Sequence, residues 1–281
     1  MSASALALLF FFPTTTVASS ARSKRGDPPS RTATAHPLGD LLAQGKHKEG
    51  LDWLASFGKG TPEEARYRGL FNHGLGRPDE TLRDLVPVYR AQPKDDAVAL
   101  AVAEASLWKK DYKTATSVLG GLQAPDEPDA LRVRGMLFEQ AGRLPEAVEL
   151  YDRAIPRLRA PWEVMERRAQ VLSWMKRFDD ARVAFTQIAD DPRAELALRR
   201  RSRVRLAELS AWNKDLDGAL AQVTALLREA PGQIDALLLE GQVLEWQGRF
   251  GEAKQVYSRI LAADGGNAPA RLRLNKLLWV K

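Results

Sequence analysis

The chain has 281 residues, of which 28% are charged and 44% hydrophobic, values that are ordinary for a soluble protein. It has no cysteine, which excludes disulfides, thiolate zinc sites and cysteine nucleophiles. The formal net charge is +6, but half of this excess lies in residues 1–36. The other half is spread over residues 37–281, whereas nucleic-acid-binding proteins concentrate much more basic charge on their folded part. Composition therefore argues against nucleic acid as a partner.

Residues 1–36 differ from the rest of the chain. Residues 5–12 form an apolar run of eight, which is too short to span a bilayer as a helix, since that needs about 20 residues. Ser19-Ser20-Ala21 then suits a signal-peptidase site, although no Lys or Arg precedes the apolar run. Residues 23–37 are rich in Ser, Thr, Pro and Arg, which is typical of a disordered tether. We therefore expect a signal-like segment, and favour an exported protein, periplasmic or envelope-associated, over a cytoplasmic one.

A small residue recurs along the rest of the chain at a nearly constant interval: Gly50, Thr81, Ala115, Ala147, Ala181, Ala219 and Ala253. Twelve residues before all but the first stands a second small residue: Gly69, Ala103, Gly135, Ala169, Ala207 and Gly241. A period of about 34 residues with paired small residues indicates stacked helix-turn-helix units, because helices cross closely only where side chains are short. No segment shows the sustained alternation of apolar and polar residues that would predict a strand.

The repeat predicts seven units over residues 37–267, of which the first is short and degenerate. The interval from Ala181 to Ala219 is the longest, which predicts extra residues in a loop around Asp190-Asp191-Pro192. Residues 268–281 predict an amphipathic helix that covers the apolar face of the last unit, because the end of a solenoid cannot be left bare. A solenoid of this kind is expected to be a monomer.

The order of residues within a unit, seen most clearly in Asp129–Ala160, resembles the tetratricopeptide repeat family. The resemblance implies an all-α, right-handed superhelical solenoid that binds a partner peptide or helix in its concave groove. It also implies that first-helix side chains line this groove. The matching positions are Arg132, Glu139, Glu163, Glu166, Gln170, Arg201, Glu208, Asp235, Gln242 and Glu245. Arg205, which shares a helix face with Arg201, is added to the candidate partner-binding residues. The Lys and Asn set with which some members bind a chaperone's C-terminal carboxylate is absent, since Met136, Val204 and Leu238 occupy places where polar residues are needed.

Four tryptophans stand seven residues before the small residue of their units: Trp108, Trp174, Trp212 and Trp246. All four are therefore expected to end a first helix. A ladder of this kind could stack on sugar rings, as in an envelope or polysaccharide-export assembly factor, or could seal the turn between two helices. We favour packing, because a repeated position more often serves the repeat.

A dense basic run from Arg193 to Arg205 contains six arginines and is offset by Glu195 alone. It could bind an acidic peptide, an anionic glycan or nucleic acid, or it could be a solvated face whose arginines pair with nearby carboxylates. Sequence alone leaves both interpretations open.

Catalytic and cofactor signatures are absent. The sequence has no His-x-x-x-His pair, no phosphate-binding Gly-rich loop after a strand and no Gly-x-Ser-x-Gly. We expect a protein without cofactor or metal that acts as a non-enzymatic interaction scaffold.

Overall fold

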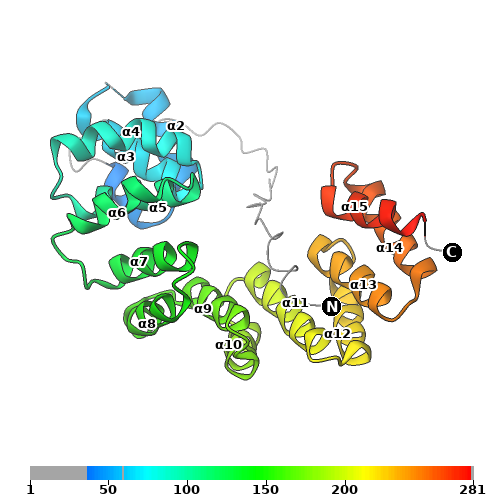
Figure 1. The fold of residues 1–281 in the computed structure, drawn as a ribbon. Coiled ribbons are helices and arrows are strands. Elements are labelled where there is room, and N and C mark those ends of the chain that lie inside the picture. The colour runs from blue at the N-terminus through cyan, green and yellow to red at the C-terminus, as the bar shows by residue number, and fades with distance from the viewer. Residues whose placement is uncertain (1–36, 59, 280–281) are drawn as a thin grey trace. The chain divides into compact units, whose positions relative to one another are not determined.

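A computed structural model describes residues 37–58 and 60–279 (Figure 1). The signal-like segment and the tether predicted for residues 1–36 lie outside the described residues. All regular structure in the described part is helical, with no strand. The helices are α1 (Pro37–Ala43), α2 (His47–Phe57), α3 (Pro62–Gly74), α4 (Pro78–Ala91), α5 (Asp96–Trp108), α6 (Tyr112–Gly120), α7 (Pro128–Gln140), α8 (Leu144–Ala154), α9 (Trp162–Trp174), α10 (Phe178–Asp190), α11 (Leu196–Trp212), α12 (Leu216–Glu229), α13 (Ile234–Trp246), α14 (Phe250–Ala263) and α15 (Ala268–Leu277), with a short 3-10 helix, Ile155–Arg157, after α8.

The order of the helices confirms the predicted repeat. Within the two compact units, six successive pairs of helices pack together: α1 with α2, α3 with α4, α5 with α6, α9 with α10, α11 with α12 and α13 with α14. The first pair is the shortest, as the degenerate first unit predicted. The final helix, α15, packs against α14 and buries Ala270 and Leu277, which confirms the predicted capping helix.

The chain divides into two compact units, residues 1–141 and 142–281. The division falls at the turn between α7 and α8, inside the repeat whose sequence pattern is clearest. In the first unit α7 packs on α5 and α6, and in the second α8 packs on α9.

Short polar side chains start several helices. Asp95, Asp111, Asp215 and Asn267 each accept a hydrogen bond from the backbone N–H three residues later, which satisfies an amide that the helix leaves free. Thr61 and Glu64 form a reciprocal capping box at the start of α3. The helix boundaries are thus encoded locally, before any tertiary packing.

The paired small residues lie where two helices cross. An added Cβ at Gly69 in α3 would stand 2.3 Å from the side chain of Leu85 in α4, and one at Gly241 in α13 would stand 2.6 Å from the ring of Tyr257 in α14. Real Cβ atoms essentially never come so close to another heavy atom. The crossing therefore combines a small residue on the first helix with a large, fully buried residue on the second.

The predicted place of the extra residues was wrong. They lie in α11, which has 17 residues where α9 and α13 have 13, and not in the loop around Asp190. The added turn at the start of α11 brings Leu198 into a small apolar cluster with Ile188 and Ala194. Burial of Leu198 favours helix over loop there, a tertiary effect that the spacing of the small residues could not reveal.

The close crossing in the last repeat predicts opposite effects for two glycines. Gly241→Ala should destabilise the protein by about 1–3 kcal/mol, because the new methyl meets the Tyr257 ring. Gly251→Ala, in α14, meets no atom within 4 Å and should be neutral or stabilise by up to about 1 kcal/mol, since alanine favours helix. Thermal or urea unfolding of both variants tests this, and equal stabilities would contradict the crossing.

Candidate partner-binding site

Three first helices of the second compact unit, α9, α11 and α13, bring several of the predicted site residues together. Helix α11 packs against both α9 and α13. Arg201 in α11 donates to both carboxylate oxygens of Glu166 in α9, at 2.6 Å each. This two-bonded geometry fixes the guanidinium plane, so Arg201 is held in a defined orientation.

The same face carries a second ion pair, between Arg205 and Glu208, one turn further along α11. Arg205 Nη1 lies 2.9 and 2.7 Å from the two carboxylate oxygens of Glu208, and both side chains are largely buried. Burial raises the pKa of Glu208 despite the attraction of Arg205, and the nearby charge of Asp235 in α13 adds to the rise. Glu208 therefore takes up a proton more readily than an ordinary glutamate does.

We call Glu163, Glu166, Arg201, Arg205, Glu208 and Asp235 the first-helix cluster. Glu163 and Asp235 act electrostatically on Arg201, and both are exposed. Four carboxylates thus face two guanidinium groups, which leaves an excess of negative charge. The exposed carboxylates can receive a cationic side chain, while the ion pairs beneath them fix the surface that it would meet.

Three other predicted residues belong to this unit: Gln170, Gln242 and Glu245. Gln170 in α9 and Gln242 in α13 are half-buried. Glu245 accepts a hydrogen bond from Tyr257 and lies 3.3 Å from Arg273 in α15. Burial, together with this hydrogen bond, raises the pKa of the Tyr257 phenol. The contacts of Glu245 therefore join the last repeat to the capping helix.

In the first compact unit, Arg132 has a partner that sequence reasoning missed. Its guanidinium donates to both oxygens of Glu104 in α5, at 2.7 and 2.8 Å, and Glu104 is buried. His73 in α3 lies 3.3 Å from the same carboxylate and stacks on Trp108 at 5.3 Å between ring centroids. Glu104 belongs to the repeat before that of Arg132, so only an alignment of successive repeats could have suggested the pair. The other predicted residue of this unit, Glu139, is half-buried near the end of α7.

Most arginines of the basic run from Arg193 to Arg205 have partners within the protein. Arg193, Arg201, Arg203 and Arg205 form ion pairs with Asp191, Glu166, Glu229 and Glu208, and Arg199 donates to the carbonyl of Ala189. The Nε of Arg200 is buried without a hydrogen-bond partner among the described residues. Most of the acidic partners come from other helices and loops, so the density of arginine in the sequence gives no reason to expect a polyanion at this place.

The predicted tryptophans end their first helices. Trp108, Trp174, Trp212 and Trp246 are the last residues of α5, α9, α11 and α13, and they keep 36%, 44%, 42% and 40% of their surface exposed. Trp212 also contacts Phe178, the first residue of α10, at 6.1 Å between ring centroids. Each of these side chains thus serves packing in part and leaves a large part of its ring open to solvent.

The turns after these tryptophans hold a feature that sequence reasoning missed. Lys110, Lys176 and Lys214 have positive φ angles of 61°, 61° and 67°, and among the described residues they are the only residues other than glycine that do. Glycine occupies the same place after other first helices, at Gly76, Gly142 and Gly248. A left-handed conformation costs a residue with a Cβ about 1–2 kcal/mol, so lysine at this position has a local cost. The sequence did hold a signal of this left-handed conformation, because these lysines stand where other repeats have glycine.

Comparison with known proteins agrees with this architecture. A tetratricopeptide repeat sequence profile matches residues 210–277, and a second profile of the same description matches residues 111–161. Comparison with curated protein sequences gave no match. The chain therefore contains tetratricopeptide repeats.

Solved structures show the same fold at low identity. A chain of the APC/C hetero-tetramer Cut9–Hcn1 is 14% identical with a TM-score of 0.66, over 86% of this chain and 48% of that one. A tetratricopeptide repeat protein from Parabacteroides merdae is 15% identical with a TM-score of 0.62, over 86% and 96%. The type IV pilus biogenesis factor PilW is 15% identical with a TM-score of 0.63, over 77% and 99%. This chain thus spans about half of the Cut9–Hcn1 chain that it matches.

The three apolar residues at places where some family members need polar ones contribute to the core. Met136 and Val204 are buried and Leu238 is partly buried in the core of its repeat pair.

None of the helices in the described part is both long and apolar enough to cross a membrane.

The buried contact of Glu104 predicts a large effect of a small change. Burial would raise the pKa of Glu104, but His73 and the Arg132 guanidinium hold it well below the ordinary value. Glu104→Gln should destabilise the first compact unit by about 3–5 kcal/mol near neutral pH, because Arg132 would keep a buried charge without its partner. Thermal unfolding monitored by circular dichroism measures the loss.

The pH dependence of this variant follows from the sign of the shift. A carboxyl group whose pKa is lowered by folding stabilises the protein at pH values above its pKa in the unfolded chain. This contribution is lost as the pH falls toward the lower pKa of the folded state. The difference in stability between the wild-type protein and Glu104→Gln should therefore shrink on acidification. Glu49→Gln, which breaks an exposed pair with Lys46, serves as control and should change stability by less than about 1 kcal/mol. A difference that grows at acidic pH would contradict the assignment.

Proposed function

We propose that this protein is a non-catalytic scaffold that binds a partner protein on its first helices, in the position of the family's concave groove. The tetratricopeptide fold supports a role in protein–protein interaction. We further propose that the second compact unit receives a basic peptide or a helix with a basic face. The observation that carries this proposal is the excess of carboxylates in the first-helix cluster.

The ion pairs of the cluster hold its side chains in place before a partner binds. Glu166 holds Arg201 with two hydrogen bonds, and Glu208 holds Arg205. The side-chain entropy that a partner would otherwise have to remove is already lost in the free protein, which favours affinity. The exposed Glu163 and Asp235 then offer carboxylates to an incoming Lys or Arg.

Charge complementarity makes the interaction dependent on salt and on pH. Salt should weaken it, because exposed charges are screened within about 10 Å at moderate ionic strength. Acidification should also weaken it. The pKa of Glu208 is raised, so this residue loses its charge early as the pH falls and the negative excess of the cluster decreases.

A peptide array that contains basic, acidic and neutral peptides in equal numbers tests the proposal with a defined probe. The full chain should bind basic peptides and release them as salt is added. Asp235→Lys reverses an exposed charge of the cluster and should weaken this binding at least tenfold, a change of about 1.4 kcal/mol, as measured by fluorescence anisotropy of the best peptide.

Asp190→Lys is the matched control, because it makes the same charge change at the end of a second helix, α10. It should leave binding unchanged, and both variants should melt like the parent protein. Preference for acidic peptides, or equal weakening by the two variants, would refute the proposed binding face.

A further inference from the structure

The second compact unit exposes a row of aromatic side chains that the proposed function does not use. Trp174, Trp212 and Trp246 end three successive first helices, and between 40% and 44% of each side chain is exposed. We call these three residues the Trp edge. They lie at the turns between first and second helices, whereas the first-helix cluster lies along the helices. Clusters of large exposed apolar side chains often mark recognition sites on protein surfaces.

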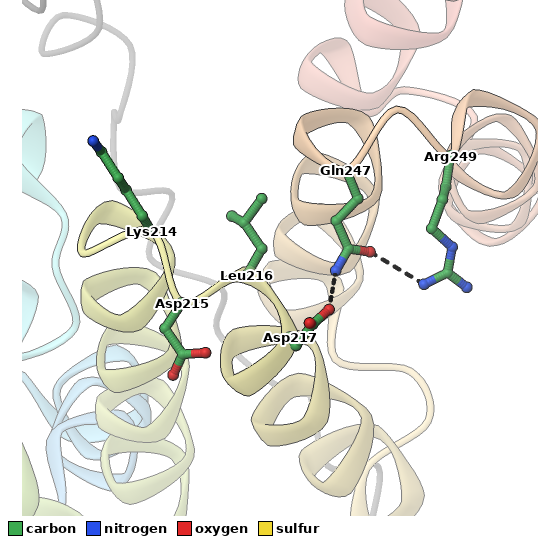
Figure 2. A pocket seen from close by; sticks show the side chains of 6 residues that line it. All are labelled: Lys214, Asp215, Leu216, Asp217, Gln247 and Arg249. Carbon is green, nitrogen blue, oxygen red and sulfur yellow. Dashed lines mark hydrogen bonds between the residues drawn. The ribbon is translucent and has the colours of Figure 1, made fainter.

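A polar hollow lies between two of these turns. It has a volume of about 490 Å³ and lies between the turn that joins α11 to α12 and the turn that joins α13 to α14 (Figure 2). Its lining is Lys214, Asp215, Leu216, Asp217, Gln247 and Arg249. Trp212 precedes the first of these turns in the chain and Trp246 precedes the second.

The polar side chains of the hollow are linked in a row. Gln247 Nε2 donates to Asp217 at 2.8 Å, and Arg249 Nη1 donates to Gln247 Oε1 at 3.1 Å, as Figure 2 shows. Arg249 is also held by Glu252 through two hydrogen bonds of 2.7 Å. The amide, the carboxylate and the guanidinium are therefore oriented in advance, and each keeps capacity for a further hydrogen bond.

An exposed aromatic residue adjoins this row in the chain. In the preceding repeat, Trp212 contacts Phe178, the first residue of α10. Trp246 and Leu216 occupy the same positions one repeat later, and Leu216 lines the hollow. Trp246 is 40% exposed and directly precedes Gln247, which lines the hollow.

The lining is neutral as a whole. Two basic side chains, Lys214 and Arg249, stand against two carboxylates, Asp215 and Asp217. A strand of nucleic acid carries one negative charge for each nucleotide and is bound by an excess of positive charge, which this lining lacks. A peptide with strong charge of either sign has no complement here either.

Flat aromatic faces beside oriented amide, carboxylate and guanidinium groups suit a sugar ring. The apolar face of the ring can lie on an indole, while its hydroxyl groups donate and accept at the edge. The spacing of the tryptophans, one in each of three repeats, suits a polymer rather than a single sugar. We infer that the Trp edge and the adjoining hollow bind a neutral hexose polysaccharide. This site is distinct from the proposed protein-binding face.

Affinity electrophoresis of the full chain in native gels tests this inference. The gels contain one of four soluble neutral polysaccharides: hydroxyethylcellulose, laminarin, dextran or galactomannan. At least one should retard the protein. Trp246→Ala and Gln247→Ala should each raise the dissociation constant of that polymer at least tenfold, because the first removes the stacking face and the second breaks the polar row.

Two variants serve as controls. Trp279→Ala removes the most exposed tryptophan, 89% exposed and outside the Trp edge, and should leave retardation unchanged. Asp235→Lys, which tests the protein-binding face, should leave it unchanged as well, so that the two proposals fail separately. Circular dichroism melts like that of the parent protein show that Trp246→Ala and Gln247→Ala remain folded.

Three results would overturn the inference. The first is the absence of retardation in all four polymers. The second is retardation that Trp246→Ala and Gln247→Ala leave intact. The third is tighter binding to alginate or to a single-stranded thymidine oligonucleotide than to any neutral polymer, which would point to an anionic ligand.

Discussion

The close crossing of paired helices, seen between α3 and α4 and between α13 and α14, is the contact on which the rest of this structure depends. A large buried side chain on the second helix fits against a small residue on the first, as Tyr257 does against Gly241 and Leu85 does against Gly69. Protein interiors are packed like crystals, so an added methyl at such a crossing has no free space to enter. The distance between the two helices of a pair is therefore set by the sizes of two side chains.

This constraint creates two surfaces of different character in the second compact unit. First helices that pack side by side bring Arg201 between Glu166 and Asp235, although these residues are far apart in the sequence. The turns at the ends of the same helices repeat the tryptophans at equivalent positions. A face with fixed ion pairs and an excess of carboxylates suits a basic protein segment, while the neutral, aromatic turn edge suits a sugar polymer. Both surfaces follow from a single repeated geometry.

Much of the fold could be predicted from the sequence because the repeat is encoded in local spacing. The small residues, the tryptophans that end first helices and the capping helix α15 all follow from periodicity. Prediction failed where contacts between distant residues decide the outcome. The added turn of α11 is stabilised by burial of Leu198, and Arg201 and Arg203 of the same helix obtain their charge partners from other elements. Nothing in the sequence around Glu104 distinguishes it from an ordinary helix residue, because its partner Arg132 comes from α7.

The candidate site was predictable as a set of positions but not as a pattern of charge. The family resemblance gives the first-helix positions, while the pairing of their charges depends on how α9, α11 and α13 approach one another. The polar hollow has no sequence motif, because its lining comes from two turns about one repeat apart. Lysine at a left-handed turn position where other repeats have glycine is the one local sign that these turns differ.

A double-mutant cycle at the last crossing tests the central claim most directly. The double variant Gly241→Ala and Tyr257→Val recreates the pair Ala207 and Val223, which occupies the same positions one repeat earlier. If the crossing is set by complementary size, Gly241→Ala should cost much less stability in the Tyr257→Val background than beside the native Tyr257, with a coupling of about 1 kcal/mol or more. Additive losses in urea unfolding, with no coupling between the two positions, would contradict the account.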